Sequence, residues 1–501
     1  MSDLGRSMKR MASVAMIAAL FFAPGAALAQ QAGTDPGAVR ISLEEAVARA
    51  LRSSREVRAA RAQVELADAQ VTAARAQALP QVDLNLGYTR TIESAFDMSG
   101  GFELPDSLRF APDPSLPIED RVAYLENRVP LAGLAAMGSL FSNMPFGQKN
   151  TYMAAISGSQ ILYSGGRVGA ALDIADKFEE SARLNLREAE SEVELQVRTA
   201  YYQALLAKEM EAIASEALAQ AERFLEEERL RHQAGRASEL DLMRAEVSRD
   251  NLHPQLVQAR NAAELAMLNL KRLLDLPLDT ELELTTELVP PSEAELAAAI
   301  AAKHPDLKRR PAVEAAERQV AIAERQVDIA KGAFLPSVAL TTSYGRQLFP
   351  STAFEFDGQW RTDWTVSVGV SIPVFKGFQR TAELARARAQ LESAKIQVAQ
   401  LEAAVHLQYE QALGERERAG SAIAAREQTA RVAQRVYDLT VLRYEQGVAT
   451  QLEVSEARLA ALQARTNLAQ AVADFYIADA AVRRALGATS AAVTPGTGKE
   501  R

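Results

Sequence analysis

The sequence predicts a mixed α and β membrane protein, in which a transmembrane β-barrel continues into a long periplasmic α-helical barrel. Three features predict this fold class: an internal duplication, strands with one apolar face, and very long helices without proline. Four strands cannot close a barrel within one chain, and such barrels usually have an even strand count. We therefore expect a trimeric barrel of about 12 strands, with about four strands per chain.

The chain begins with the pattern of a secretory signal. Lys9 and Arg10 precede an apolar run over 11–22, and small residues follow over 27–29. This pattern predicts a signal peptide over 1–29, which is removed on export. A transmembrane anchor is the alternative, but the apolar run is shorter than a membrane-spanning helix requires.

The composition narrows the function classes. The net charge of −9 argues against nucleic acid as a partner. Cysteine is absent, so disulfides, thiol nucleophiles and an acylated N-terminal cysteine are excluded. The histidines stand singly and no nucleophile or phosphate-binding motif occurs, so we expect neither an enzyme, a metal site nor a cofactor. The four histidines are His232, His253, His304 and His406.

Two copies of one unit make up the chain. Gln63-Val64 and Leu79-Pro80 recur at an offset of 256 residues, whereas Gly165 to Arg272 has matches at a constant offset of 212. The first copy is therefore 44 residues longer, and the extra residues fall within 91–149. Because the insertion leaves both flanks in register, we expect a long external loop at a hairpin tip. The loop would either cap the outer mouth or elaborate the surface.

Each copy contains two strands with one apolar face. Every even position from 364 to 374 is apolar, whereas the odd positions from 365 to 371 carry hydroxyl groups or glycine. Such alternation predicts a strand, and a small soluble sheet is the alternative to a barrel wall. We expect strands over about 82–90, 151–163, 337–346 and 362–375. Aromatic residues near their ends would form a membrane girdle, namely Tyr88, Tyr152, Tyr344, Trp360, Trp364 and Phe375.

Long helices follow the second strand of each copy. The ranges 167–231 and 379–443 contain no proline and little glycine, and about 65 helical residues extend roughly 100 Å. Helices over 238–275 and 450–487 would return along them. The first repeat thus covers 30–275 and the second 312–487, with an equatorial segment over 276–311 between them and a flexible tail over 488–501.

This organisation resembles the TolC-like outer membrane efflux protein family, the outer membrane factor of tripartite efflux and type I secretion systems. The resemblance spans 41–487 and rests on the duplication and on two turn motifs, 231–235 and 443–447, each before a returning helix. It implies a homotrimer in the cell outer membrane that passes substrates outward from a periplasmic adaptor and an inner-membrane pump of the RND or ABC type. The pump selects the exported substrate, so the resemblance is compatible with drug efflux and with protein secretion. A periplasmic coiled-coil adaptor or a structural spacer is the alternative.

The resemblance also implies a constriction at the periplasmic tip. The tip carboxylates of the family match Asp241, Glu453 and Glu456. Glu453 and Glu456 lie three positions apart and thus on one helix face, where they would form a cation-binding ring in a trimer. A solvated helix face is the alternative.

A latch and an adaptor contact are implied at the same tip. Tyr444 matches the latch tyrosine, which would bond to Asp241, but Ala449 stands where the family has an arginine. Arg236 is a candidate substitute. The turn glycines that the adaptor contacts match Gly235 and Gly447.

Overall fold

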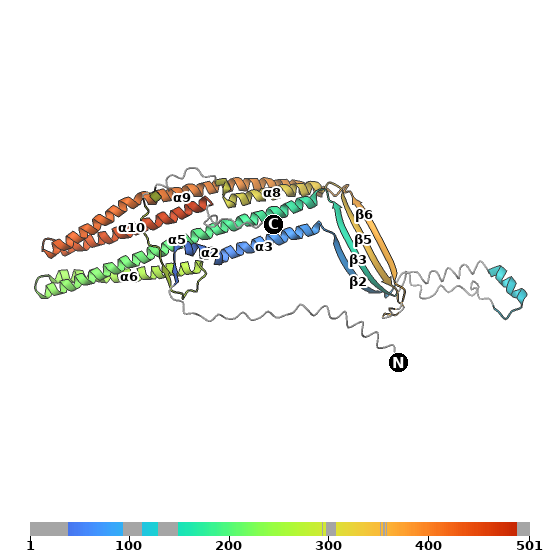
Figure 1. The fold of residues 1–501 in the computed structure, drawn as a ribbon, viewed down its shortest axis with the longest axis horizontal. Helices are drawn as coiled ribbons and strands as arrows, with labels where there is room; N and C mark the ends of the chain where they lie inside the picture. The colour runs from blue at the N-terminus through green and yellow to red at the C-terminus, as the bar shows by residue number, and fades with distance from the viewer. Residues whose placement is uncertain are drawn as a thin grey trace, which may run out of the picture.

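The computed structural model is an elongated molecule, in which a shaft of long helices meets a β-sheet at one end (Figure 1). The predicted signal peptide, the predicted tail and most of the predicted external loop lie outside the described residues. No helix within the described ranges combines the length and apolar character that a membrane span needs. The structure describes residues 39–93, 113–128, 149–292, 294–296, 307–350, 352–353, 356 and 358–487.

Two uninterrupted helices run the length of the shaft, and each turns back into a shorter helix. α5 (Arg167–Gln233) and α9 (Gln379–Glu445) each contain 67 residues, enough to extend about 100 Å. Their returning partners, α6 (Glu239–Leu273) and α10 (Gln451–Ala485), each contain 35 residues. The equal lengths show the duplication in three dimensions.

Small side chains bring the helices of each hairpin close together. Ala217 and Ala221 of α5 are buried against Leu252 of α6. Ala419 of α9 is buried against Ala471 of α10. Alanine leaves room for close approach of neighbouring helices and has the highest helix propensity, so the same residue type favours both the helix and its packing.

Two further helices lie between the hairpins and the sheet. They are α3 (Arg55–Gln77) and α8 (Pro311–Gly332). The end of α6 meets the start of α3, where Arg55 forms an ion pair with Asp275 at 3.2 Å. The end of α10 meets α8 in the same way, because Gly487 packs on the ring of Pro311. Each repeat therefore contributes one continuous and one interrupted helical column to the shaft.

A belt crosses the shaft at the level of these interruptions. It contains α2 (Leu43–Ser53), η2 (Leu307–Arg309) and two short parallel strands, β1 (Val39–Ile41) and β4 (Leu282–Leu284). Tyr201 of α5 is fully buried beneath it, and its hydroxyl lies 3.1 Å from the Ile41 carbonyl oxygen and 3.0 Å from Thr286 Oγ1. Because β1 pairs with β4, the segment predicted over 276–311 shares this belt with the start of the described chain.

The four long strands form one antiparallel sheet with the order β2-β3-β5-β6. They are β2 (Gln81–Arg90), β3 (Asn150–Tyr163), β5 (Ser337–Leu348) and β6 (Arg361–Ser371). The strand predicted over 362–375 is thus four residues too long, since β6 ends at Ser371. Pro373 has no N–H to donate to a neighbouring strand, so the apolar alternation continues beyond the end of the pairing.

Candidate functional site

One face of the sheet is apolar and exposed. The pairing register places Leu84, Ile156, Tyr344 and Trp364 in one row across all four strands. Other apolar side chains on this face include Val82, Leu86, Leu340, Val366, Val368 and Val370. Most of these side chains are exposed in the single chain, including every apolar residue of β2 and β6. Soluble monomers rarely expose so continuous an apolar surface, so this face is suited to lipid.

The opposite face of the sheet is polar and lined with small side chains. The row adjacent to that of Tyr344 and Trp364 consists of polar residues, namely Asp83, Ser157, Ser343 and Thr365. Further hydroxyl groups and glycines follow on the same face, namely Ser159, Thr341, Gly345, Ser367 and Gly369. The sheet therefore has the composition of a wall between lipid and a water-filled passage.

Aromatic side chains gather at the loop end of the apolar face. Tyr88 and Tyr152 are cross-strand partners with ring centroids 4.7 Å apart. Tyr344 and Trp364 are also partners, with an edge contact at 6.3 Å. Close by, Trp360 lies beneath the guanidinium of Arg346 at 5.8 Å. Five of the six predicted girdle residues thus lie at this end.

Phe375, the sixth, lies near the helix end of the sheet together with aromatic residues that the sequence analysis missed. Its ring meets that of Phe378 at 5.6 Å, and both side chains are exposed. Tyr163 reaches the apolar face here, because a register shift after Ile161 makes it the partner of Val338. A bulge breaks the period-two pattern, so simple alternation places Tyr163 on the wrong face.

At the far end of the shaft, each hairpin closes in a turn that needs a left-handed glycine. Gly235 has φ +70° and Gly447 has φ +77°. No atom beyond their own neighbours lies within 4 Å of a Cβ built on either glycine. Both turns therefore present open backbone at the tip of the shaft.

The predicted constriction residues begin the returning helices. Asp241 and Glu453 occupy equivalent capping boxes, in which Ser238 and Thr450 accept hydrogen bonds from their backbone N–H groups at 3.1 and 3.3 Å. A capping box stabilises a helix start by itself, so it is a structural role that the Ser-x-x-Asp and Thr-x-x-Glu spacing could have predicted. Glu453 and Glu456 are both exposed on α10.

In the single chain, Tyr444 and Asp241 have partners other than each other, so the latch contact between them stays a prediction. Asp241 accepts hydrogen bonds from the Ser238 hydroxyl and backbone at 2.6 and 3.4 Å, within its own turn. Tyr444 lies instead against α5, with its ring 5.5 Å from that of Phe224. Arg236, the candidate substitute, has an exposed side chain.

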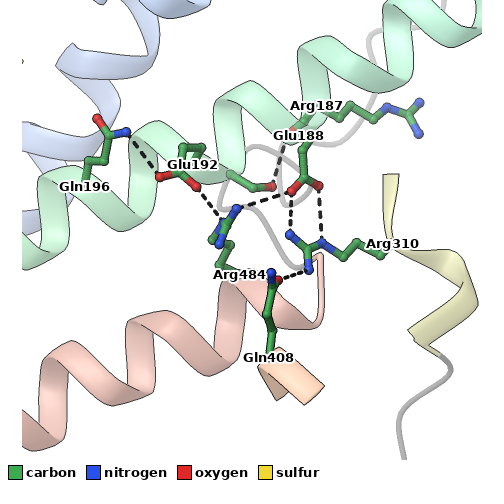
Figure 2. Close-up of polar contacts among 8 residues, drawn as sticks. Arg187, Glu188, Glu192, Gln196, Arg310, Gln408 and Arg484 are labelled. Atoms are coloured by element: carbon green, nitrogen blue, oxygen red, sulfur yellow. Dashed lines mark hydrogen bonds and ion pairs between the residues drawn. The ribbon is translucent and has the colours of Figure 1, made fainter. Parts of the chain in front are cut away.

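Figure 2 shows a second polar cluster, where α8 begins and α10 ends. Arg310 is buried, lies 2.7 Å from Glu188 of α5 and donates to Gln408 of α9 at 2.9 Å. Arg484 of α10 lies 2.7 Å from Glu192 of α5. These contacts join α5, the start of α8, α9 and the end of α10. Within the described residues, no group of three or more potential metal-binding side chains occurs.

A long helical shaft joined to a sheet with one apolar and one polar face is the architecture of a membrane duct. The chain belongs to the outer membrane efflux protein family, whose model matches residues 46–121, 130–275 and 306–488. The predicted exit duct in the outer membrane, with its helices in the periplasm, is thereby confirmed. The alternatives of an adaptor and a structural spacer are wrong.

Relatives and solved structures agree with this assignment. The chain is 26% identical over 345 residues to the outer membrane efflux protein BepC of Brucella suis. The aligned region covers 68% of this chain and 74% of that protein. It is 26% identical over 262 residues to the toluene efflux pump outer membrane protein TtgI of Pseudomonas putida, over 51% of this chain and 53% of the other.

The fold is shared with outer-membrane proteins whose crystal structures are known. VceC of Vibrio cholerae has a TM-score of 0.68 at 18% identity, covering 89% of this chain and 96% of that one. The open MtrE channel of Neisseria gonorrhoeae has a TM-score of 0.67 at 19% identity, covering 89% and 88%. At such identities the similarity shows the fold alone.

Proposed function

We propose that three copies of this chain assemble into one duct, which carries export substrates from a periplasmic adaptor and an inner-membrane pump through the outer membrane. The observation that carries this proposal is the unclosed sheet. In the described part of the chain, β2 pairs only with β3 and β6 pairs only with β5. Each copy thus offers two free edges, which a neighbouring copy on either side would satisfy.

Closure by three copies gives a barrel of about 12 strands, an even number as membrane barrels usually have. The apolar faces would then form one outer surface and the polar faces one inner surface. Tyr88, Tyr152, Tyr344, Trp360 and Trp364 would form the outer aromatic girdle, and Phe375 would belong to the inner one.

The two tip turns are the proposed adaptor contact, and their glycines provide the test. Gly235→Trp and Gly447→Trp are expected to leave outer-membrane insertion intact but to abolish export. The open space around both glycines leaves room for the new side chain within the chain itself, whereas a docked adaptor would collide with it. Insertion is measured by membrane fractionation, and export by growth on a toxic compound whose removal requires this duct.

Gly235→Asn and Gly447→Asn are the matched controls. Asparagine tolerates a positive φ better than other side chains, so it tests backbone conformation with little added bulk. Export should survive these changes. If the tryptophan variants also export normally, then the turns are not the adaptor contact.

The proposed cation constriction gives a second test. Replacing both Glu453 and Glu456 with alanine is expected to weaken cation selectivity and to raise conductance, because a trimer would lose stacked rings of negative charge at its narrowest point. Conductance in a planar bilayer, with and without divalent cations, measures both effects. Identical current–voltage curves for the variant and the wild type would remove these carboxylates from the constriction.

A further inference from the structure

An arginine interrupts the apolar face of the sheet near its loop end. Because the helices lie in the periplasm, this end of the sheet faces the outside of the cell (Figure 1). Arg346 of β5 lies on the apolar face, one row beyond Tyr344 and Trp364. The next row outward contains Tyr88 and Tyr152. Arg346 therefore lies among the aromatic residues of this end, at the level where the hydrocarbon of a membrane meets the lipid headgroups.

Small neighbours leave the guanidinium of Arg346 accessible. Its cross-strand partners are Ala154 of β3 and Thr362 of β6, and both Arg346 and Thr362 are exposed. The guanidinium lies over the ring of Trp360, 5.8 Å from its centre. A guanidinium that stacks on an aromatic ring still has N–H groups at its edge to donate to another ligand. Thr362 adds a hydroxyl group beside it.

The charge of Arg346 is not compensated by a carboxylate. Within the described residues Arg346 forms no ion pair, and its contact with Trp360 involves a neutral ring. An arginine on a lipid-facing surface is unfavourable in the hydrocarbon but is tolerated at the level of the headgroups, where anionic groups can pair with it. The position of Arg346 therefore favours an anionic partner supplied by the membrane.

The loop between β5 and β6 covers the apolar face on the outer side of Arg346. The ring of Phe356 lies 5.0 Å from that of Tyr152, and the Tyr152 hydroxyl donates a hydrogen bond to the Ala353 carbonyl oxygen. Leu348, the cross-strand partner of Tyr152, is 1% exposed, and a Cβ on Gly358 would lie 2.7 Å from its methyl carbon. A ligand therefore approaches Arg346 from the apolar strands, along the membrane, rather than from the water outside.

We propose that Arg346, Thr362 and Trp360 form a binding site for a phosphate group of lipopolysaccharide, the phosphorylated glycolipid of the outer leaflet. The guanidinium binds the phosphate through paired, charge-assisted hydrogen bonds, and the Thr362 hydroxyl donates a further one. The acyl chains of the lipid pack on the exposed apolar side chains of the neighbouring rows, such as Trp364 and Val366. This inference goes beyond the proposed export function, because it assigns a lipid ligand to the outer surface of the sheet.

Arg90 of β2 is the candidate partner for a second phosphate of the same lipid. It lies on the apolar face opposite Asn150, one row beyond Tyr88, and it is exposed. Arg90 also forms no ion pair within the part of the chain that the structure describes. Two strand spacings and two rows separate the backbones of Arg90 and Arg346 by roughly 17 Å, too far to share one phosphate. The headgroup of lipopolysaccharide carries two phosphates on a disaccharide and can therefore contact both arginines.

Binding of purified lipopolysaccharide to the detergent-extracted protein tests the site, with native mass spectrometry as the measurement. The wild type should bind this lipid at least about tenfold more tightly than the same lipid after chemical removal of its phosphates. Arg346→Gln should weaken binding of the phosphorylated lipid about tenfold, and Arg90→Gln in addition should weaken it further. Inorganic phosphate should not displace the lipid, because the acyl chains contribute to its binding.

Arg361→Gln is the matched control. Arg361 is an exposed arginine at the same level of the sheet, but its pairing with Gln347 places it on the polar face. This variant should bind lipopolysaccharide like the wild type.

Equal binding of the phosphorylated and dephosphorylated lipids by the wild type would overturn the site, and this comparison needs no substitution that could disturb folding. An equal loss for Arg346→Gln and Arg361→Gln would overturn it as well, since only general surface charge would then matter. Displacement of the lipid by inorganic phosphate would show that the site does not select a lipid. Each of these results leaves the proposed export duct intact, because its passage lies on the other face of the sheet.

Discussion

Val366→Arg in the sheet is expected to abolish accumulation of the protein in the outer membrane. Val366 lies at the centre of β6, on the apolar face, and is well exposed in the single chain. In water such a change would be nearly neutral. At the middle of a bilayer an arginine on the lipid face of a barrel costs about 2–4 kcal/mol, and a trimer would contain three of them.

The adjacent residue supplies the control. Ser367→Arg introduces the same side chain one position along, on the polar face of the sheet. It should assemble normally, because a charge in a water-filled passage keeps its hydration. Heat-dependent mobility on gels and native mass spectrometry of the detergent extract measure folding and assembly. Equal loss of both variants would mean that the two faces do not differ in environment.

Arg310→Ala is expected to lower the stability of the shaft by about 3–5 kcal/mol, the usual effect of breaking a buried ion pair. Arg310 is 4% exposed and lies 2.7 Å from Glu188, with Gln408 as a further partner. Without the guanidinium, part of the Glu188 charge and the Gln408 carbonyl oxygen lose their compensation. Thermal loss of helical circular dichroism in detergent measures the change.

Arg325→Ala tests whether burial is the cause. Arg325 also reaches from α8 to α5, where it pairs with Asp173 at 3.2 Å, but both side chains are about half exposed. Surface pairs of this kind contribute about 0–1 kcal/mol. The melting temperature should therefore fall clearly for Arg310→Ala and little for Arg325→Ala. A similar fall for both would contradict a special role for the buried cluster.

Periodicity and repetition made most of the fold predictable. The constant offset between the copies reflects helices of 67 and 35 residues that occur twice. Alternation located the strands most clearly in β2 and β6, where one face is apolar along most of its length. The ends of the strands were harder to predict from the sequence. Pairing stops where a neighbour can no longer accept or donate, as at Pro373, and hydropathy carries no information about this.

The tip was predicted less well, because its contacts join distant helices. The turn glycines follow from local backbone geometry, and both were found by sequence. The partner of Tyr444 depends on how α9 packs against α5, and local sequence carries no information about this packing. Ser248 of α6 accepts a hydrogen bond from Arg458 of α10, but the two residues are 210 positions apart, and neither stands in a motif.

The interrupted columns have a mechanical consequence. α5 and α9 pass through the equatorial belt unbroken, while the columns beside them are divided there between α6 and α3 and between α10 and α8. The shaft thus combines two continuous helices with two interrupted helical columns, and both interruptions lie at the level of the belt. A force applied at the tip would be transmitted to the sheet along α5 and α9. Bending would concentrate at the belt, where the contacts of Arg310 stiffen the junction between α10 and α8.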